Sequence, residues 1–216
     1  MELWYPGARK WLGPSNKKRY GTNGVKGIVN HSAVGYSAGL HHELVRADRG
    51  AAWHFSVMQD GTVEQHYPLN SVLWHAADAF GNMNYIGIEH EGGFNPANEP
   101  LTVKQREASV KLCQWIAKQA GFSLSRVDKK TLWEHNEIAD KATQCPSGRI
   151  PWQYYVDEVT TKVPRLPTIE EFGDVVASIY YYSHLNTPMK ATLIPISIEG
   201  RVTRYELVIT GGDFST

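Results

Sequence analysis

The sequence contains little cysteine, no surplus of charge and no long apolar run. Its 216 residues include two cysteines, Cys113 and Cys145. That is too few for a secreted disulfide scaffold, so we expect a reducing compartment or an unpaired role for each thiol. The 22 basic and 22 acidic side chains balance. Because binding to nucleic acid needs a basic surface, this balance argues against a nucleic-acid partner.

Stretches that would enter or cross a membrane are also missing from the sequence. No run of about 18 apolar residues is present, and the N-terminus lacks the apolar core of a signal peptide. We therefore expect no membrane span and synthesis as a soluble cytoplasmic protein. A hydrophobic content of 42% and a charged content of 20% are typical of a globular chain. The length allows one good core and a small second unit.

Hydrophobic periodicity predicts a mixture of strands and helices up to about residue 160. Thr102 and Gln105 fit a helical capping box, and Cys113 falls on the apolar stripe of the helix that follows, as a core thiol would. Residues 78–84 and 133–148 have the composition of loops. The predicted elements are a strand at 28–31, a helix at 37–47, a hairpin of 53–59 and 62–67, a strand at 85–91, a helix from Thr102 to Gly121 and a short helix after Pro151.

Prolines near residue 165 divide the chain into two predicted parts. Val163-Pro164-Arg165-Leu166-Pro167 has the composition of a linker. Beyond it, helical spacing over 168–185 and two strand-like runs, 191–198 and 202–209, predict a helix followed by a hairpin. We therefore expect a main domain over residues 1–163 and a small α+β unit over 167–216.

Two histidines and a cysteine form a candidate metal site. His31 ends a predicted strand, while His135 and Cys145 lie ten positions apart in a polar segment. Such ligands suit Zn²⁺ with a fourth position open for water. Spacing alone leaves other interpretations open: three unrelated residues, a cysteine hydrolase with Cys145 as nucleophile and His135 as base, or a module that binds without catalysis.

A hydrolytic zinc site also needs a group that takes a proton from the attacking water, and Glu89 is our candidate. It lies in a predicted strand beside apolar neighbours, where an ordinary exposed carboxylate is less expected. Burial would raise the pKa of Glu89 and a nearby metal would lower it. Glu91, two residues further along the same face, is the fallback.

Several ordered motifs resemble one known family. The motifs are Val29-Asn30-His31-Ser32, Trp53-His54-Phe55, Trp74-His75-Ala76, Asn84-Tyr85-Ile86-Gly87-Ile88-Glu89, His135 and Cys145-Pro146. In this order they resemble the type 2 N-acetylmuramoyl-L-alanine amidases, which include phage endolysins and peptidoglycan-recognition proteins. The resemblance implies an α/β fold with a central mixed β-sheet flanked by helices. It also implies hydrolysis of the amide between N-acetylmuramic acid and L-alanine in peptidoglycan.

The resemblance also implies a role for each matching residue. His31, His135 and Cys145 match the zinc ligands, Glu89 matches the general base, and Trp53, His75 and Asn84 match positions along the substrate groove. Two residues depart from the pattern: Trp53 stands where many members have Tyr, and Thr143 stands where many have Lys. Thr143 can offer the developing oxyanion a neutral hydrogen bond but no charge.

The resemblance and the predicted second unit together suggest a biological setting. We expect a phage or prophage endolysin that acts on the bacterial cell wall. Residues 167–216 would bind the wall or hold a homodimer together. A module that binds peptidoglycan without cleaving it, and a cytoplasmic amidase that recycles muropeptides, remain the alternatives.

Overall fold

A computed structural model describes residues 2–160, 190–198 and 201–210 of the chain. It divides into two compact units, Met1–Val159 and Thr160–Thr216, which are described separately. The helix predicted over 168–185 lies outside the described residues.

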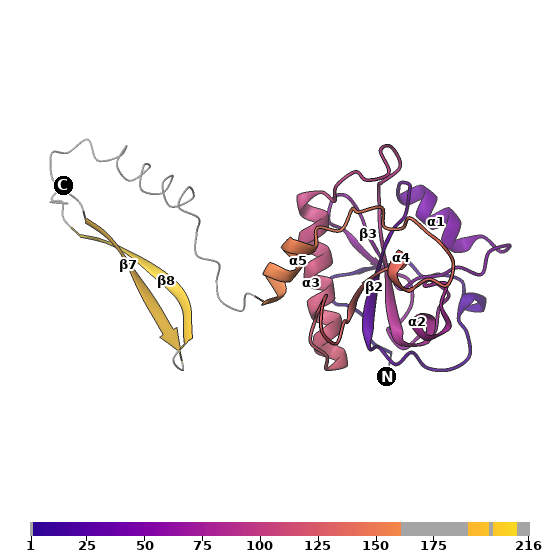
Figure 1. Ribbon diagram of the computed structural model, residues 1–216, viewed down its shortest axis with the longest axis horizontal. Coiled ribbons are helices and arrows are strands. Elements are labelled where there is room, and N and C mark those ends of the chain that lie inside the picture. The colour runs from indigo at the N-terminus through magenta and orange to yellow at the C-terminus, as the bar shows by residue number, and fades with distance from the viewer. Residues whose placement is uncertain (1, 161–189, 199–200, 211–216) are drawn as a thin grey trace. The chain divides into compact units, whose positions relative to one another are not determined.

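One mixed sheet forms the centre of the first unit (Figure 1). Its six strands run in the order β1-β4-β3-β5-β2-β6, and among these neighbours only β3 and β4 are antiparallel. This arrangement confirms the predicted mixed sheet, and β3 and β4 confirm the hairpin around Asp60-Gly61. The strands are β1 (Arg9–Lys10), β2 (Gly27–Ser32), β3 (Phe55–Val57), β4 (Val63–Gln65), β5 (Tyr85–His90) and β6 (Leu132–Glu134).

Helices cover both faces of the sheet, as predicted. α3 (Val103–Ala120) and α5 (Trp152–Thr160) lie on one face, while α1 (Ser37–Val45), α2 (Ala79–Asn84) and α4 (His135–Ile138) lie on the other (Figure 1). Successive strand residues point to opposite faces. Ile28 and Ile86 therefore pack in one core cluster with the α3 residue Ile116, while Val29 packs in another. The second face is the one that receives polar functional side chains.

The long helix α3 begins and ends where the sequence predicts. The Thr102 side chain accepts a hydrogen bond from the Gln105 backbone N–H at 3.1 Å, and Gly121 ends the helix in the left-handed conformation at φ 76°. Cys113 is completely buried in the core, as predicted. The predicted capping box is only half formed, because the Gln105 side chain donates instead to the backbone oxygens of Val57 and Glu91.

Two segments predicted as loops contain regular structure. Residues 79–84 form α2, whose N-cap Asp78 accepts a hydrogen bond from the Gly81 N–H. The segment from residue 133 contains the end of β6 and the single-turn helix α4. Each of these three elements is too short to show a clear hydrophobic period.

The second unit contains an antiparallel hairpin of β7 (Lys190–Ile198) and β8 (Arg201–Thr210). These strands confirm the predicted hairpin.

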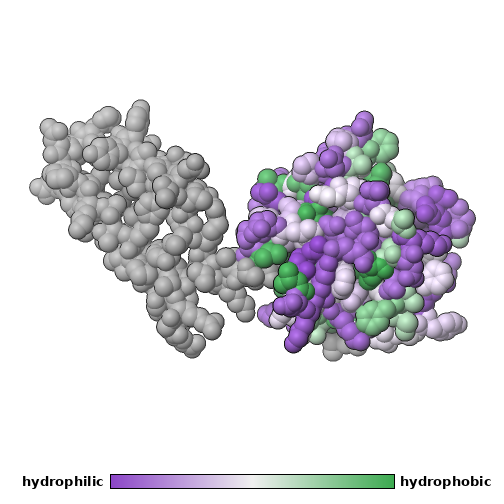
Figure 2. All heavy atoms as spheres, viewed as in Figure 1, coloured by the Kyte–Doolittle hydropathy of each residue, from purple (hydrophilic) through white to green (hydrophobic). Residues whose placement is uncertain are grey.

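Among the described residues, no helix is long and apolar enough to cross a membrane. The visible face of the first unit is mainly hydrophilic, with apolar residues in small separate areas (Figure 2).

Candidate metal centre and its groove

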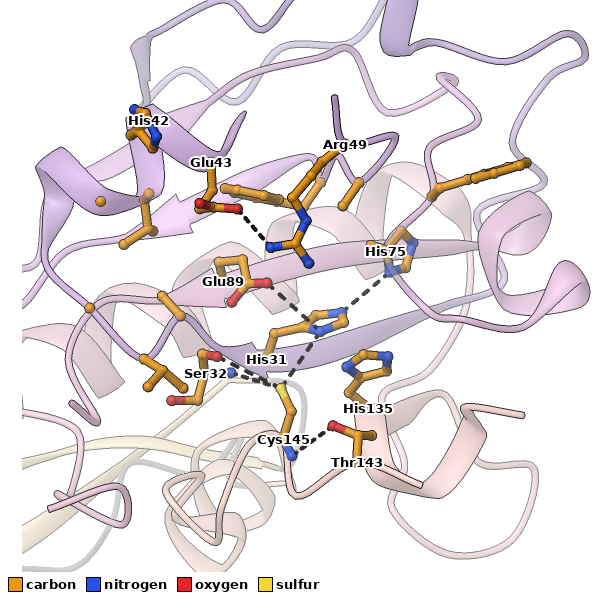
Figure 3. A pocket seen from close by; sticks show the side chains of 18 residues that line it. His31, Ser32, His42, Glu43, Arg49, His75, Glu89, His135, Thr143 and Cys145 are labelled. Carbon is orange, nitrogen blue, oxygen red and sulfur yellow. Dashed lines mark hydrogen bonds and ion pairs between the residues drawn. The ribbon is translucent and has the colours of Figure 1, made fainter. Parts of the chain in front are cut away.

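A cavity of about 520 Å³ opens beside the ends of β2 and β5, on the face that carries α1, α2 and α4. His31, His135, Cys145 and Glu89 all line it (Figure 3). Trp53, His75 and Thr143 line it as well. The structure therefore gathers the predicted site residues, with the exception of Asn84, around one cavity.

Strand pairing places the first ligand beside the candidate base. His31 and Glu89 are paired across the parallel strands β2 and β5. Because paired residues in neighbouring strands share a face of the sheet, both side chains enter the cavity. The Glu89 carboxylate lies 3.9 Å from His31 Nδ1.

The other two candidate ligands arrive from the segment after β6. That strand pairs with β2 and leads directly into α4, so His135, the first residue of the helix, lies with its ring centroid 4.5 Å from that of His31. Cys145 follows in a loop, with its Sγ 3.8 Å from His31 Nδ1. One ligand atom from each of the three residues lies within 4.8 Å of the other two.

The thiol of Cys145 has the surroundings of a ligand rather than of a nucleophile. The backbone N–H of Ser32 donates to its Sγ at 3.2 Å, and its own N–H donates to Thr143 Oγ1 at 3.2 Å. Burial and the nearby Glu89 carboxylate raise the pKa of Cys145 to about 12. Nucleophilic cysteines have a lowered pKa, so this environment does not favour the cysteine-hydrolase interpretation.

Two buried polar atoms at the cavity lack a hydrogen-bond partner among the described residues: Glu89 Oε2 and His135 Nε2. Burial raises the pKa of Glu89 to about 8, against the opposing effect of Arg149. Burial also lowers the pKa values of His31 and His135, so both rings are neutral and able to ligate. A divalent cation would engage the unpaired nitrogen and favour the ionised carboxylate. The residues present therefore fit zinc.

Trp53 lines the cavity with its ring but not with its N–H group. Its Nε1 donates to Ser56 Oγ at 2.9 Å, and that hydroxyl also contacts His66 Nε2 at 2.8 Å. Trp53 as a whole is 7% exposed. The part of Trp53 that faces the cavity is therefore apolar.

Of the two other residues predicted along a substrate groove, His75 lines the cavity and Asn84 does not. Both ring nitrogens of His75 already have protein partners, His31 Nε2 at 3.3 Å and the Tyr85 carbonyl at 3.1 Å. Asn84 is not among the cavity-lining residues; it ends α2, where its Nδ2 donates to the Phe80 carbonyl at 2.9 Å. The unforeseen helix α2 is the reason, because it carries Asn84 away from the cavity.

Sequence reasoning did not identify Asn82, Arg149 or Arg49. Asn82 Oδ1 accepts from the backbone N–H groups of His75 at 2.9 Å and Ala76 at 2.8 Å, and so holds the loop that carries His75. Arg149 is buried next to the cavity-lining residue Ser32, and its Nη1 donates a hydrogen bond to Ser32 Oγ at 2.9 Å. Arg49 extends into the cavity from the opposite wall (Figure 3). The sequence signal that was available for Arg149 is its position, since this charged residue follows the Cys145-Pro146 motif by three positions.

The fallback base, Glu91, lies outside this cavity. Its two oxygens accept from the backbone N–H of Ser37 at 2.7 Å and of Gln59 at 2.8 Å. Ser37 is the first residue of α1. Glu91 therefore holds the start of that helix, and Glu89, not Glu91, lies in the cavity with the candidate ligands.

Comparison with known proteins assigns the chain to a family. The model of the N-acetylmuramoyl-L-alanine amidase family matches residues 21–148, which is more than half of the chain. The chain belongs to this family, and the match includes His31, Glu89, His135 and Cys145.

Two curated relatives from Bacillus subtilis carry the same family name. The N-acetylmuramoyl-L-alanine amidase XlyA is 36% identical over 144 residues, which cover 60% of this chain and 44% of XlyA. The N-acetylmuramoyl-L-alanine amidase CwlH is 28% identical over 123 residues, which cover 51% of this chain and 44% of CwlH. The matched region thus spans less than half the length of either relative.

Solved structures share the fold. PlyL has a TM-score of 0.57 at 18% identity, with 71% of this chain and 97% of PlyL covered. The catalytic domain of XlyA has a TM-score of 0.54 at 24% identity, with 69% and 97% covered. The amidase LysC from Clostridium intestinale has a TM-score of 0.52 at 20% identity, with 73% and 100% covered. These matches agree with the mixed sheet and flanking helices described above.

Proposed function

We propose that the first unit is a zinc-dependent N-acetylmuramoyl-L-alanine amidase that hydrolyses the amide between N-acetylmuramic acid and L-alanine in peptidoglycan. The observation that carries the proposal is that two histidines, a cysteine and a half-buried carboxylate meet in one cavity of a chain that belongs to this family. His31, His135 and Cys145 would hold the metal. When bound, zinc would polarise the amide carbonyl and lower the pKa of water.

Glu89 would act as the general base and then as the general acid. It would take the proton of the attacking water and return that proton to the leaving amine of L-alanine, so that its charge is restored at the end of the cycle. Its free Oε2 and its position one strand away from His31 support this role.

Thr143 and Arg49 would contact the substrate from opposite walls. The Thr143 oxygen accepts from the Cys145 N–H, which leaves its hydroxyl hydrogen free to donate to the oxyanion. Arg49 is the only Lys or Arg among the described residues that line the cavity, and it holds Glu43 through Nη1 at 2.9 Å. Its remaining N–H groups would suit a carboxylate of the stem peptide.

The test combines metal analysis with product analysis. The purified full chain should contain one equivalent of zinc, and digestion of peptidoglycan should release L-alanine amino termini without new reducing sugars. Glu89→Gln should retain zinc and lose turnover by about 100-fold or more. Full activity in Glu89→Gln would remove Glu89 as the base, and zinc without any cleavage would indicate a module that binds peptidoglycan only.

We further propose that the protein acts on the cell wall as an endolysin. The second unit supports this proposal, since a wall-binding or dimerising module would hold the catalytic unit near its polymeric substrate. Intact sacculi should be cleaved at least as well as soluble muropeptides. Cleavage of soluble muropeptides alone would instead indicate a recycling amidase.

A further inference from the structure

His75 and His31 form a chain of ring nitrogens that ends at a backbone carbonyl. The Tyr85 oxygen lies 3.1 Å from His75 Nε2, and His75 Nδ1 lies 3.3 Å from His31 Nε2. The remaining nitrogen, His31 Nδ1, faces Cys145 Sγ at 3.8 Å. Figure 3 shows His31 between His75 on one side and Cys145 on the other.

The Tyr85 carbonyl at one end of this row of ring nitrogens determines which nitrogen of each histidine carries the hydrogen. A carbonyl oxygen only accepts, so the His75 hydrogen must be on Nε2. Both hydrogen-bond partners of the ring are neutral groups, which suits a neutral imidazole with its lone pair on Nδ1. That lone pair can only accept, so His31 donates through Nε2. The lone pair of His31 is then on Nδ1, on the side of Cys145 and Glu89.

The fold holds the His75 ring in place on several sides. A Cβ atom added at Gly87 would lie 2.6 Å from His75 Cγ, so the ring is packed directly against the β5 backbone. Asn82 binds the backbone N–H of His75, and the His54 ring lies with its centroid 5.8 Å away, edge to face. This support leaves the ring little freedom to turn toward a substrate.

We propose that His75 is a positioning residue that fixes the tautomer of His31, so that the Nδ1 lone pair points into the metal site, and that it is not a substrate contact. The proposal rests on the zinc site of the proposed function. Partners behind a ligating histidine fix its orientation and tautomer, and losing one typically weakens metal binding about 10–100-fold.

The first experiment reads the tautomer without metal or activity. In the full chain treated with chelator, ¹⁵N NMR of the histidine rings should show His31 with its hydrogen on Nε2 and none on Nδ1. In His75→Leu the His31 ring should become a mixture of tautomers. A hydrogen on Nδ1 of His31 in the wild-type protein would overturn the proposal.

The second experiment measures zinc affinity by competition with a chelating dye. His75→Leu removes the acceptor and should weaken binding about 10–100-fold. His75→Asn places an amide oxygen near the position of Nδ1 and should bind within a few-fold of wild type. If His75 mattered only for packing, the small polar Asn would be at least as damaging as Leu, and that ranking would refute the proposal.

His54→Leu is the matched control, because the buried His54 ring packs beside His75 while its own nitrogens bond the Gly87 N–H and the Ser71 carbonyl rather than a candidate ligand. It should lower the midpoint of urea unfolding and leave zinc affinity within a few-fold of wild type. A loss of affinity equal to that of His75→Leu would assign the effect to packing. If wild-type protein binds no zinc, the proposed function fails, while the NMR result still decides the role of His75.

Discussion

Replacing Arg149 by Met should destabilise the first unit more than any change at its surface. The buried guanidinium makes four hydrogen bonds, all to neutral groups: Nε to the Glu99 carbonyl at 2.7 Å, Nη1 to Ser32 Oγ at 2.9 Å and the His90 carbonyl at 3.1 Å, and Nη2 to the Glu91 carbonyl at 2.8 Å. These bonds connect the ends of β2 and β5 to the loop near Glu99.

The expected size of the loss follows from those four acceptors. Leaving a buried acceptor unpaired costs roughly 1–3 kcal/mol. Part of this loss is offset, because Met does not carry a charge that must be buried. The cost of burying the charge in the wild-type protein is the reason that burial lowers the pKa of Arg149. We therefore expect the free energy of unfolding to fall by about 4 kcal/mol in Arg149→Met, a large part of the roughly 5–15 kcal/mol of a typical domain. Arg149→Lys, with three donors, should lose about half as much.

Urea unfolding followed by tryptophan fluorescence measures this loss directly. All seven tryptophans lie before residue 160, so the signal reports the first unit alone. Chelator should be present, because metal binding would add to the apparent stability. Arg46→Met, which removes an arginine paired with Glu43 and Asp48 at the surface, is the control and should change the midpoint little. A loss below about 1 kcal/mol in Arg149→Met would refute the reasoning.

Three further predictions concern acid stability, packing and metal binding. Burial lowers the pKa of His66 to about 4 from 6.5, so its stabilising contribution is complete above pH 6.5 and is lost toward pH 4; urea midpoints of wild type should fall more steeply over this range than those of His66→Gln. Gly87→Ala should lower both stability and zinc affinity by displacing His75, whereas Gly39→Ala, with open space around it in α1, should leave zinc affinity unchanged and should not lower stability in the same assays. Cys145→Ser should abolish stoichiometric zinc by metal analysis, and unchanged zinc content would remove Cys145 from the ligand set.

Local patterns were sufficient to predict most of the fold. Thr102 and Gly121 bound α3 because capping depends on residues next to the helix ends. The hairpin around Asp60-Gly61 and the strand ending near His31 likewise follow from adjacent residues. The strand β6 and the helix α4 were missed, because three and four residues carry no period and depend on pairing with β2.

The candidate site was predictable as a set of residue types but not as a network. Ligand chemistry and family motifs indicated His31, His135 and Cys145, and the structure brings them together. Asn82 was missed because it acts through the backbone N–H groups of the preceding loop, and Arg149 because its partners are mainly backbone groups of distant segments; no sequence pattern encodes such contacts.

The pairing of His31 with Glu89 makes their distance independent of the chain between them. Their relative position is fixed by the ladder between β2 and β5, while residues 33–84, which connect these strands, form α1, β3, β4, α2 and the loops between them. Insertions or deletions in the loops of that connection can alter the groove walls without moving the carboxylate relative to the ligand. The protein can thus change what it recognises by remodelling its loops while the reacting groups keep their spacing, which makes this connection the natural place to engineer specificity.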